Sequence, residues 1–185
     1  MTDQIKEYLK DCLWVATGLF VVRCLISWPE LVSNLSAYTL FGFAGEAIGV
    51  TSIIMTIYER FLWKYNPLSK VPKLKCNYEG VVCSTYDEIE RKASIEIKQT
   101  LLTVHVTMVT AESKSKSITA TIEEVLGEKQ LIYSYLNTPE SGYRKRSEIH
   151  YGTAMLCIDN PNEISGQYYT DRKTTGNMTF SESER

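Results

Sequence analysis

Two long runs of apolar residues occupy the first third of the chain, over about residues 9–28 and 38–63. Each run is close to the ~20 residues that a helix rising ~1.5 Å per residue needs to cross ~30 Å of hydrocarbon. The pattern therefore predicts two transmembrane helices within residues 1–64. A short connection that contains Pro29 and Glu30 separates the two runs, so we expect a helical hairpin.

The first run could also be a cleaved signal peptide. No small-residue cleavage site follows it, because Trp28, Pro29 and Glu30 stand where such a site is needed. A second apolar run comes directly afterwards, and a hairpin accounts for both runs. We therefore expect the first run to be retained as an anchor.

From Cys76 onward the dominant hydrophobic period is two. Ile95 and Ile97 alternate with Glu96 and Lys98, and several later segments repeat this pattern. Such alternation is typical of strands with one buried face and one face in water. Short polar or glycine-containing turns separate eight segments of this kind. The segments are residues 77–86, 91–99, 103–111, 117–125, 130–136, 148–159, 163–171 and 175–181.

Eight short antiparallel strands in sequence can close into an up-and-down β-barrel over residues 76–181. Closure removes the exposed edges and leaves an interior large enough for side chains or one small ligand. A two-sheet sandwich is the alternative. The predicted fold class is thus a membrane α-helical hairpin followed by an all-β domain. Residues 65–75 would form a juxtamembrane connector and residues 182–185 a tail.

Charge distinguishes the two parts and predicts their orientation. Residues 1–75 hold 8 Lys or Arg against 6 Asp or Glu, whereas residues 76–185 hold 12 against 16. The short connection between the apolar runs has no Lys or Arg, and basic residues flank both runs on their other sides. The positive-inside rule then places both termini in the cytoplasm. The five cysteines form no CxxC pair, which is consistent with reduced structural thiols.

Two ionisable residues and two glycines within the apolar runs are candidates for membrane assembly. Arg23 and Glu46 lie at similar depth and could pair, because an ionisable group in hydrocarbon costs at least ~2.5 kcal/mol unless a partner or water offsets the cost. In the alternative, Arg23 snorkels to the outer headgroups and Glu46 stays protonated. Gly45 and Gly49 form a GxxxG pattern, which puts small residues on one helix face as close packing requires.

Catalytic and metal-binding patterns are poorly represented. His105 is expected on a solvated strand face, whereas His150 shares parity with apolar residues and should face the interior. A hydrolytic triad of His150, Asp159 and a serine is conceivable, but no nucleophile elbow or oxyanion motif accompanies it. Metal-ligand spacings and phosphate-binding glycine loops are also missing from the sequence. We therefore expect a protein that is not an enzyme and has no cofactor or metal.

Polar residues at strand ends favour a binding function. Hydroxyl and amide groups can bond to base edges, tyrosines can stack on bases, and an arginine can pair with a phosphate. The acidic balance of the β domain argues against a nucleic acid polymer, which would need an extended basic surface. The candidate ligand-binding residues are Thr110, Ser113, Ser115, Tyr135, Asn137, His150, Tyr169 and Arg172.

The order of these elements resembles the two-transmembrane, β-strand-rich effectors that accompany CD-NTase nucleotide cyclases in bacterial CBASS antiphage systems. The resemblance covers nearly the whole chain. It includes the connector WKYNPLSKVP at 63–72, YEG at 78–80, HYGTA at 150–154 and GxYYTxR at 166–172. It implies a cytosolic minimal β-barrel that senses a cyclic dinucleotide made by a CD-NTase.

The same resemblance implies how the protein acts. On ligand binding the protein would form a homo-oligomer and disrupt the lipid of the bacterial inner membrane, causing abortive infection. From the chemistry of the residues themselves, Arg172 would pair with a phosphate and Tyr135 or Tyr169 would stack on a base. Two other classes stay open at this point. One is a constitutive membrane-anchored, lipocalin-like carrier of a small lipid or metabolite, and the other is an anchored enzyme.

Overall fold

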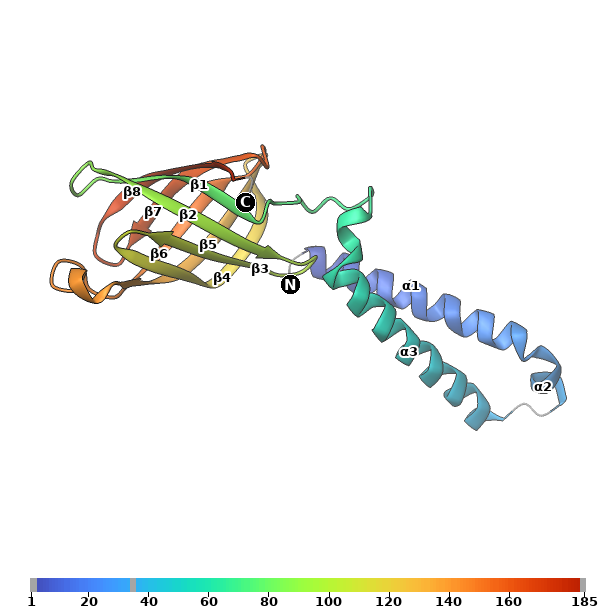
Figure 1. Cartoon of the computed structure of the whole chain (residues 1–185). Coiled ribbons are helices and arrows are strands. Elements are labelled where there is room, and N and C mark those ends of the chain that lie inside the picture. The colour runs from blue at the N-terminus through green and yellow to red at the C-terminus, as the bar shows by residue number, and fades with distance from the viewer. Residues whose placement is uncertain (1–2, 34–35, 184–185) are drawn as a thin grey trace. The chain divides into compact units, whose positions relative to one another are not determined.

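The computed structural model describes residues 3–33 and 36–183, and the chain divides into two compact units, residues 1–69 and 70–185 (Figure 1). The first unit contains the helices α1 (Asp3–Ile26), α2 (Trp28–Ser33) and α3 (Ala37–Arg60), followed by the 3-10 helix η1 (Leu62–Tyr65). The expected connection between the long helices thus includes a short helix, α2. Helix α3 ends at Arg60, three residues before the predicted end of the second apolar run.

Helix α3 packs against α1 through one face. Its buried residues, Phe43, Ala47, Thr51 and Met55, recur every four positions and therefore lie on one side of the helix. The hydroxyl of Ser36 accepts a hydrogen bond from the backbone N–H of Tyr38 at 3.2 Å and caps the start of α3. The helical unit is therefore a packed pair rather than two separate rods.

Within the described residues, α3 is the one helix that is long and apolar enough to cross a membrane. Helix α1 has the same length of 24 residues, but Lys6, Glu7, Lys10 and Asp11 fill its first half and Arg23 interrupts its apolar half. Its crossing of the membrane stays a prediction.

The second unit is a closed barrel of eight antiparallel strands in sequence order, with β1 paired to β8 (Figure 1). This confirms the predicted up-and-down barrel and excludes the two-sheet sandwich. The strands are β1 (Asn77–Ser84), β2 (Glu90–Gln99), β3 (Val104–Thr110), β4 (Ser113–Val125), β5 (Glu128–Pro139), β6 (His150–Cys157), β7 (Glu163–Thr170) and β8 (Thr175–Glu182). A short 3-10 helix, η2 (Ser141–Tyr143), lies in the β5–β6 connection.

The last strand reaches into the segment expected as a tail. Glu182 is part of β8, and its carboxylate accepts from the Lys75 ammonium at 2.8 Å. The N–H of Ser183 donates to the carbonyl of Asn77 at 3.1 Å. These contacts join the end of β8 to the beginning of β1.

One strand departs from simple alternation. The β4–β5 register shifts between Ser117 and Thr119. Ile118 is 60% exposed, although strict alternation counted back from Ala120 would place its side chain inside the barrel. A β-bulge inserts one extra residue and reverses the parity on either side of it. The Ser117 hydroxyl accepts from the N–H of Val106 at 3.0 Å and replaces a ladder bond there.

Large apolar side chains fill the half of the barrel at which the chain enters β1. The most deeply buried of them are Tyr78, Ile95, Val106, Leu131, Tyr133, Leu156, Ile158, Ile164, Met178 and Phe180. The Tyr78 hydroxyl donates to the carbonyl of Pro161 at 2.7 Å and accepts from the N–H of Lys75 at 3.0 Å. This end of the barrel is therefore closed by a packed core.

Two buried tyrosines of this core should respond oppositely to replacement by phenylalanine. Among the described residues, the Tyr133 hydroxyl has no hydrogen-bond partner, and an unsatisfied buried donor costs about 1–3 kcal/mol. Tyr133→Phe is therefore expected to raise the free energy of unfolding, and Tyr78→Phe to lower it by a similar amount because two partners lose their bond. Denaturant unfolding of both variants measures this. Equal destabilisation by the two changes would contradict the assignment of Tyr133 as unsatisfied.

Candidate functional site

The inward-facing residues become polar toward the other end of the barrel. On β5, Leu131 and Tyr133 are followed by Tyr135 and Asn137; on β3, the apolar series ends at Thr110. This end carries the β1–β2, β3–β4, β5–β6 and β7–β8 connections. They surround a pocket of about 940 Å³, part of it open to solvent.

Seven of the eight predicted ligand-binding residues line this pocket. They are Thr110, Ser113, Ser115, Tyr135, Asn137, His150 and Arg172. They come from β3, β4, β5, β6 and the β7–β8 turn, and closure of the barrel brings them together. Residues of β1 and β2 also line the pocket, and none of them is among the eight predicted residues.

The eighth predicted residue, Tyr169, points the other way. Its side chain is 54% exposed, and the neighbouring Tyr168 lines the pocket instead. Ile164 is fully buried, and residues two and four positions later in a strand share its face. Parity with Ile164 therefore places Tyr168 at the pocket, and the predicted ligand-binding residue Tyr169 does not line it.

Two tyrosine rings in the pocket each lie against a glycine of the next strand. Tyr135 is paired in register with Gly152, and Tyr168 with Gly176. A Cβ atom added at either glycine would collide with the facing tyrosine ring. The glycines thus leave the space that the two tyrosine rings occupy at the pocket wall.

Paired polar side chains lie beside the Tyr135 ring. The Ser115 hydroxyl donates to the amide oxygen of Asn137 at 2.8 Å, and both residues are buried. Because this bond uses the amide oxygen, the amide nitrogen of Asn137 remains as a donor at the pocket wall. Ring nitrogens and carbonyls of a base could accept from it.

Thr110 and Ser113 shape the β3–β4 turn. The Thr110 hydroxyl accepts from the N–H groups of Glu112 at 3.2 Å and of Ser113 at 3.0 Å. A hydroxyl that bonds to the backbone two or three residues later is a common way to hold a tight turn. Thr110 therefore positions Glu112 at the pocket rim.

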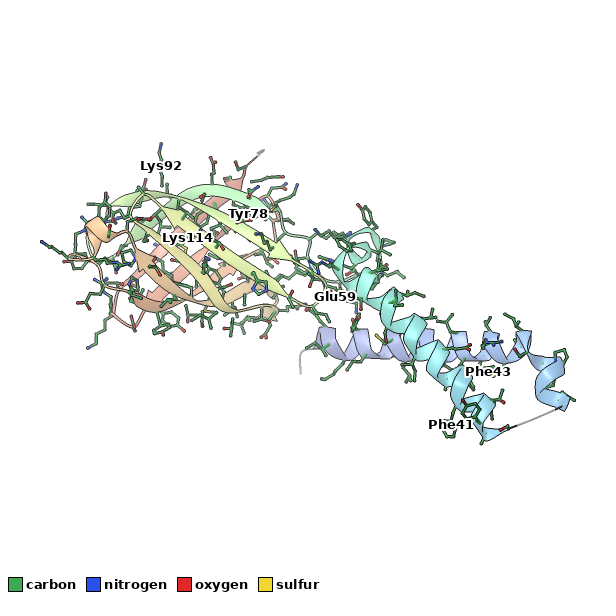
Figure 2. The ribbon with its side chains drawn as sticks, turned by 60° about the horizontal axis from the view of Figure 1, so that its bottom comes forward. Phe41, Phe43, Glu59, Tyr78, Lys92 and Lys114 are labelled. Atoms are coloured by element: carbon green, nitrogen blue, oxygen red, sulfur yellow. The ribbon has the colours of Figure 1, made fainter. Side chains whose placement is uncertain are left out.

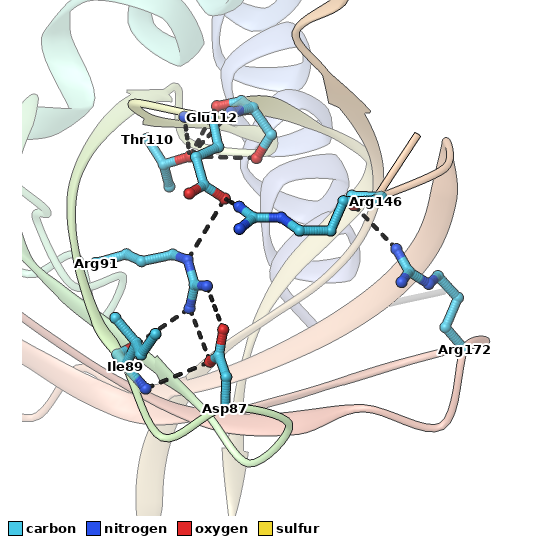
Figure 3. Close-up of polar contacts among 9 residues, drawn as sticks. Asp87, Ile89, Arg91, Thr110, Glu112, Arg146 and Arg172 are labelled. Carbon is cyan, nitrogen blue, oxygen red and sulfur yellow. Dashed lines mark hydrogen bonds and ion pairs between the residues drawn. The ribbon is translucent and has the colours of Figure 1, made fainter. Parts of the chain in front are cut away.

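Four charged residues form a network at the mouth (Figure 3). The Asp87 carboxylate binds the Arg91 guanidinium through both oxygens, with Oδ1 at 3.0 Å from Nη1. Glu112 Oε2 lies 3.5 Å from Nε of Arg91 and 2.7 Å from Nη2 of Arg146. Arg91 lies two positions before the buried Ala93 on the same strand face, so strand parity could have identified it as a pocket residue. Arg146 lies in a loop, where no periodic pattern predicts its position.

The fifth charged residue, Arg172, lies on the other side of the β5–β6 connection. Its Nη1 donates to the hydroxyl of Ser147 at 2.9 Å (Figure 3). Arg146 and Ser147 are neighbours in the chain, so this connection contacts Glu112 through one residue and Arg172 through the next. The pocket mouth therefore holds three arginines.

The protonation states of two pocket groups are well defined. Hydrogen bonding to Arg91 lowers the pKa of Asp87 to about 2, so this carboxylate is ionised in any neutral buffer. Burial and the neighbouring Tyr168 raise the pKa of the Tyr135 hydroxyl above its ordinary value. The stabilising effect of the Asp87 shift is present above the ordinary carboxyl pKa of about 4 and is lost as the pH falls toward 2.

The four residues proposed for membrane assembly lie in the helical unit. The Arg23 Nε donates to Glu46 Oε2 at 2.7 Å, and the guanidinium lies 4.3 Å from the centroid of the Phe43 ring. This ion pair supports the pairing alternative over snorkelling. A Cβ atom at Gly45 or Gly49 would meet nothing within 4 Å, so both glycines lie on an open face of α3.

Comparison with known proteins gives two matches. A family model described as "Cap15, cyclic dinucleotide receptor domain" matches residues 69–182. The chain is also 31% identical over 189 residues to the CD-NTase-associated protein 15 of Staphylococcus schleiferi, an alignment that covers 96% of this chain and 97% of that protein. The family match spans the whole barrel, and the second match includes the helices.

Proposed function

This chain belongs to the Cap15 family of CBASS effectors, and we propose that its barrel binds a cyclic dinucleotide. The observation that carries the proposal is the composition of the pocket mouth. Three arginines and two tyrosine faces surround one cavity that is closed below by an apolar core. A cyclic dinucleotide presents two phosphates and two bases, which match these groups.

In the proposed complex, Arg172 pairs with a phosphate, and Tyr135 and Tyr168 stack on the bases. Asn137 donates to a base edge. Stacking of a base on an aromatic ring is worth about 1–3 kcal/mol by alanine substitution in single-strand binders. Two such contacts and two phosphate contacts of about 1.5–3 kcal/mol each sum to roughly 5–12 kcal/mol, a range that includes the ~8.2 kcal/mol of a micromolar dissociation constant.

The geometry disfavours the two alternative classes. A lipocalin-like carrier needs an apolar lumen, but the apolar half of this barrel is filled by side chains, and charged side chains stand among the residues that line the remaining cavity. A triad of His150 and Asp159 is also disfavoured, because His150 begins β6 and Asp159 follows the other end of the same strand. The His150 ring contacts the carbonyl of Glu148 at 2.8 Å, whereas Asp159 accepts from the N–H of Lys129.

Calorimetric titration of the full chain in detergent with a panel of cyclic dinucleotides tests the proposal. We expect at least one member to bind with a dissociation constant in the micromolar range or below. Linear dinucleotides of the same bases serve as controls. If no cyclic dinucleotide binds to the folded protein at micromolar concentration, the sensor function is contradicted.

Arg172→Ala should weaken this binding by tenfold or more. The variant loses a charge-assisted contact worth about 1.5–3 kcal/mol, while the barrel core is untouched. Lys92→Ala removes the same charge from a residue that points away from the barrel (Figure 2) and should change the affinity less than twofold. Equal losses of affinity in the two variants would indicate a long-range electrostatic effect and would contradict a direct contact between Arg172 and the ligand.

For the helical unit, we propose that α1 and α3 both cross the bacterial inner membrane with the termini in the cytoplasm. Lys6 and Lys10 lie in the first turns of α1, Arg60 and Lys64 lie at and just beyond the end of α3, and residues 27–36 carry no Lys or Arg. Ligand binding to the barrel would favour an assembling state of the protein, in which α3 helices of several copies pack together and disrupt the lipid bilayer. The ligand can drive this change only by its higher affinity for that state.

A further inference from the structure

A single carboxylate oxygen of the protein lies between two arginines at the pocket mouth (Figure 3). Glu112 Oε2 is 2.7 Å from Nη2 of Arg146 and 3.5 Å from Nε of Arg91. Guanidinium groups also bind the oxygens of a phosphate through charge-assisted hydrogen bonds. Glu112 thus occupies a position that suits an external anion.

We propose that the Arg91–Arg146 pair is a phosphate subsite, and that Glu112 fills it as an internal anion until the ligand arrives. The proposal rests on the function proposed above, since it assigns the second phosphate of a cyclic dinucleotide. One phosphate binds at Arg172 and the other displaces Glu112. Both phosphates are then held from the β5–β6 connection, because Ser147 contacts Arg172 and Arg146 is its neighbour.

The two carboxylates of the network have different roles. Asp87 binds Arg91 through both oxygens and keeps its guanidinium oriented. Glu112 uses one oxygen for both arginines, and its side chain is 32% exposed, so the carboxylate can move into water. Exchange of Glu112 for a phosphodiester replaces one negative charge by another, so neither arginine is left unpaired.

This arrangement makes Glu112 a determinant of specificity. A neutral ligand cannot replace the carboxylate without leaving Arg146 unpaired, whereas an anion can. A bound anion must also interact with Arg91 and Arg146 more strongly than the Glu112 carboxylate does. This competition lowers the affinity for every anion that binds there. Removal of the Glu112 charge should therefore tighten anion binding.

The test is titration of the full chain in detergent with inorganic pyrophosphate and with the cyclic dinucleotide panel. Glu112→Gln is expected to raise the affinity for pyrophosphate about tenfold, which corresponds to about 1.4 kcal/mol. Glu124→Gln, at an exposed position of β4 near the opposite end of the barrel, makes the same charge change and should alter the affinity less than twofold. Addition of Arg146→Gln to Glu112→Gln should abolish the gain.

Unchanged or weaker pyrophosphate binding by Glu112→Gln, an equal gain from Glu124→Gln, or a gain that survives Arg146→Gln would overturn the proposal. If Glu112→Gln markedly lowers the melting temperature, the test of the subsite uses the single variant Arg146→Gln instead. It should weaken pyrophosphate binding, whereas Arg144→Gln in the same connection should not. Equal effects of these two changes would overturn the subsite.

The panel separates the subsite from the function on which it rests. If Glu112→Gln leaves the affinity for the cyclic dinucleotide unchanged, the subsite is contradicted and the sensor function stands. If Glu112→Gln gives the expected gain in pyrophosphate affinity but no cyclic dinucleotide binds, the anion site stands and a cyclic dinucleotide is contradicted as its ligand.

Discussion

Gly49→Leu should abolish membrane permeabilisation by the activated protein and leave ligand binding unchanged. Gly42, Gly45 and Gly49 lie on the side of α3 opposite to Phe43 and Ala47, which pack on α1. A Cβ at Gly49 meets nothing within 4 Å, so a larger side chain has room within one copy of the protein. It would instead separate α3 from a helix of a neighbouring copy, since close packing of membrane helices depends on small residues.

Entry of a membrane-impermeant dye into cells that express each variant with an active cyclase measures this effect. Membrane fractionation checks that the variant is present at the normal level, and calorimetry checks ligand binding. Gly18→Leu makes the same change on α1, where a Cβ also has open space, and should preserve dye entry. Full dye entry with Gly49→Leu, or equal loss with both variants, would exclude this face of α3 as the assembly surface.

Gly152→Ala should weaken binding of the cyclic dinucleotide by roughly 10- to 100-fold with little loss of stability. The added Cβ would collide with Cζ and the hydroxyl oxygen of the Tyr135 ring. These atoms lie at the end of a side chain, so the ring can turn away while the strands keep their register. The variant then loses a stacking contact worth about 1–3 kcal/mol.

Calorimetry measures the affinity of this variant, and a thermal melt measures its stability. Gly142→Ala provides the same change in the β5–β6 connection, where the Cβ meets nothing within 4 Å, and should be neutral in both assays. Unaltered affinity of a stable Gly152→Ala protein would show that the Tyr135 face does not contact the base. Gly166 is unsuitable for this comparison, because a Cβ there would meet the backbone of β6.

Most of the pocket could be anticipated from strand parity. Residues such as Asn137 and His150 share the inward face of their strands with buried apolar residues, and each stands at the same end of the barrel. Consecutive strands run in opposite directions, so the end of one strand and the start of the next meet at one mouth. Tyr168 follows this rule and lines the pocket, whereas Tyr169 is one position out of phase and is exposed.

The amino-acid sequence by itself determined the two long helices, the eight strands and their up-and-down order. Amphipathic periodicity is a local property, and neighbouring strands joined by short turns need only local pairing. Helical rise likewise placed Arg23 and Glu46 at one depth, and the structure brings them to 2.7 Å.

Only the tertiary structure decided the charged mouth and the half-filled interior. Asp87, Glu112 and Arg146 come from three separate connections, and loop residues have no periodicity that reveals where they point. Their contact depends on closure of β1 against β8 and on the stagger of all eight strands. The bulge at Ser117 also reversed the side on which Ile118 lies, because one extra residue shifts a period of two.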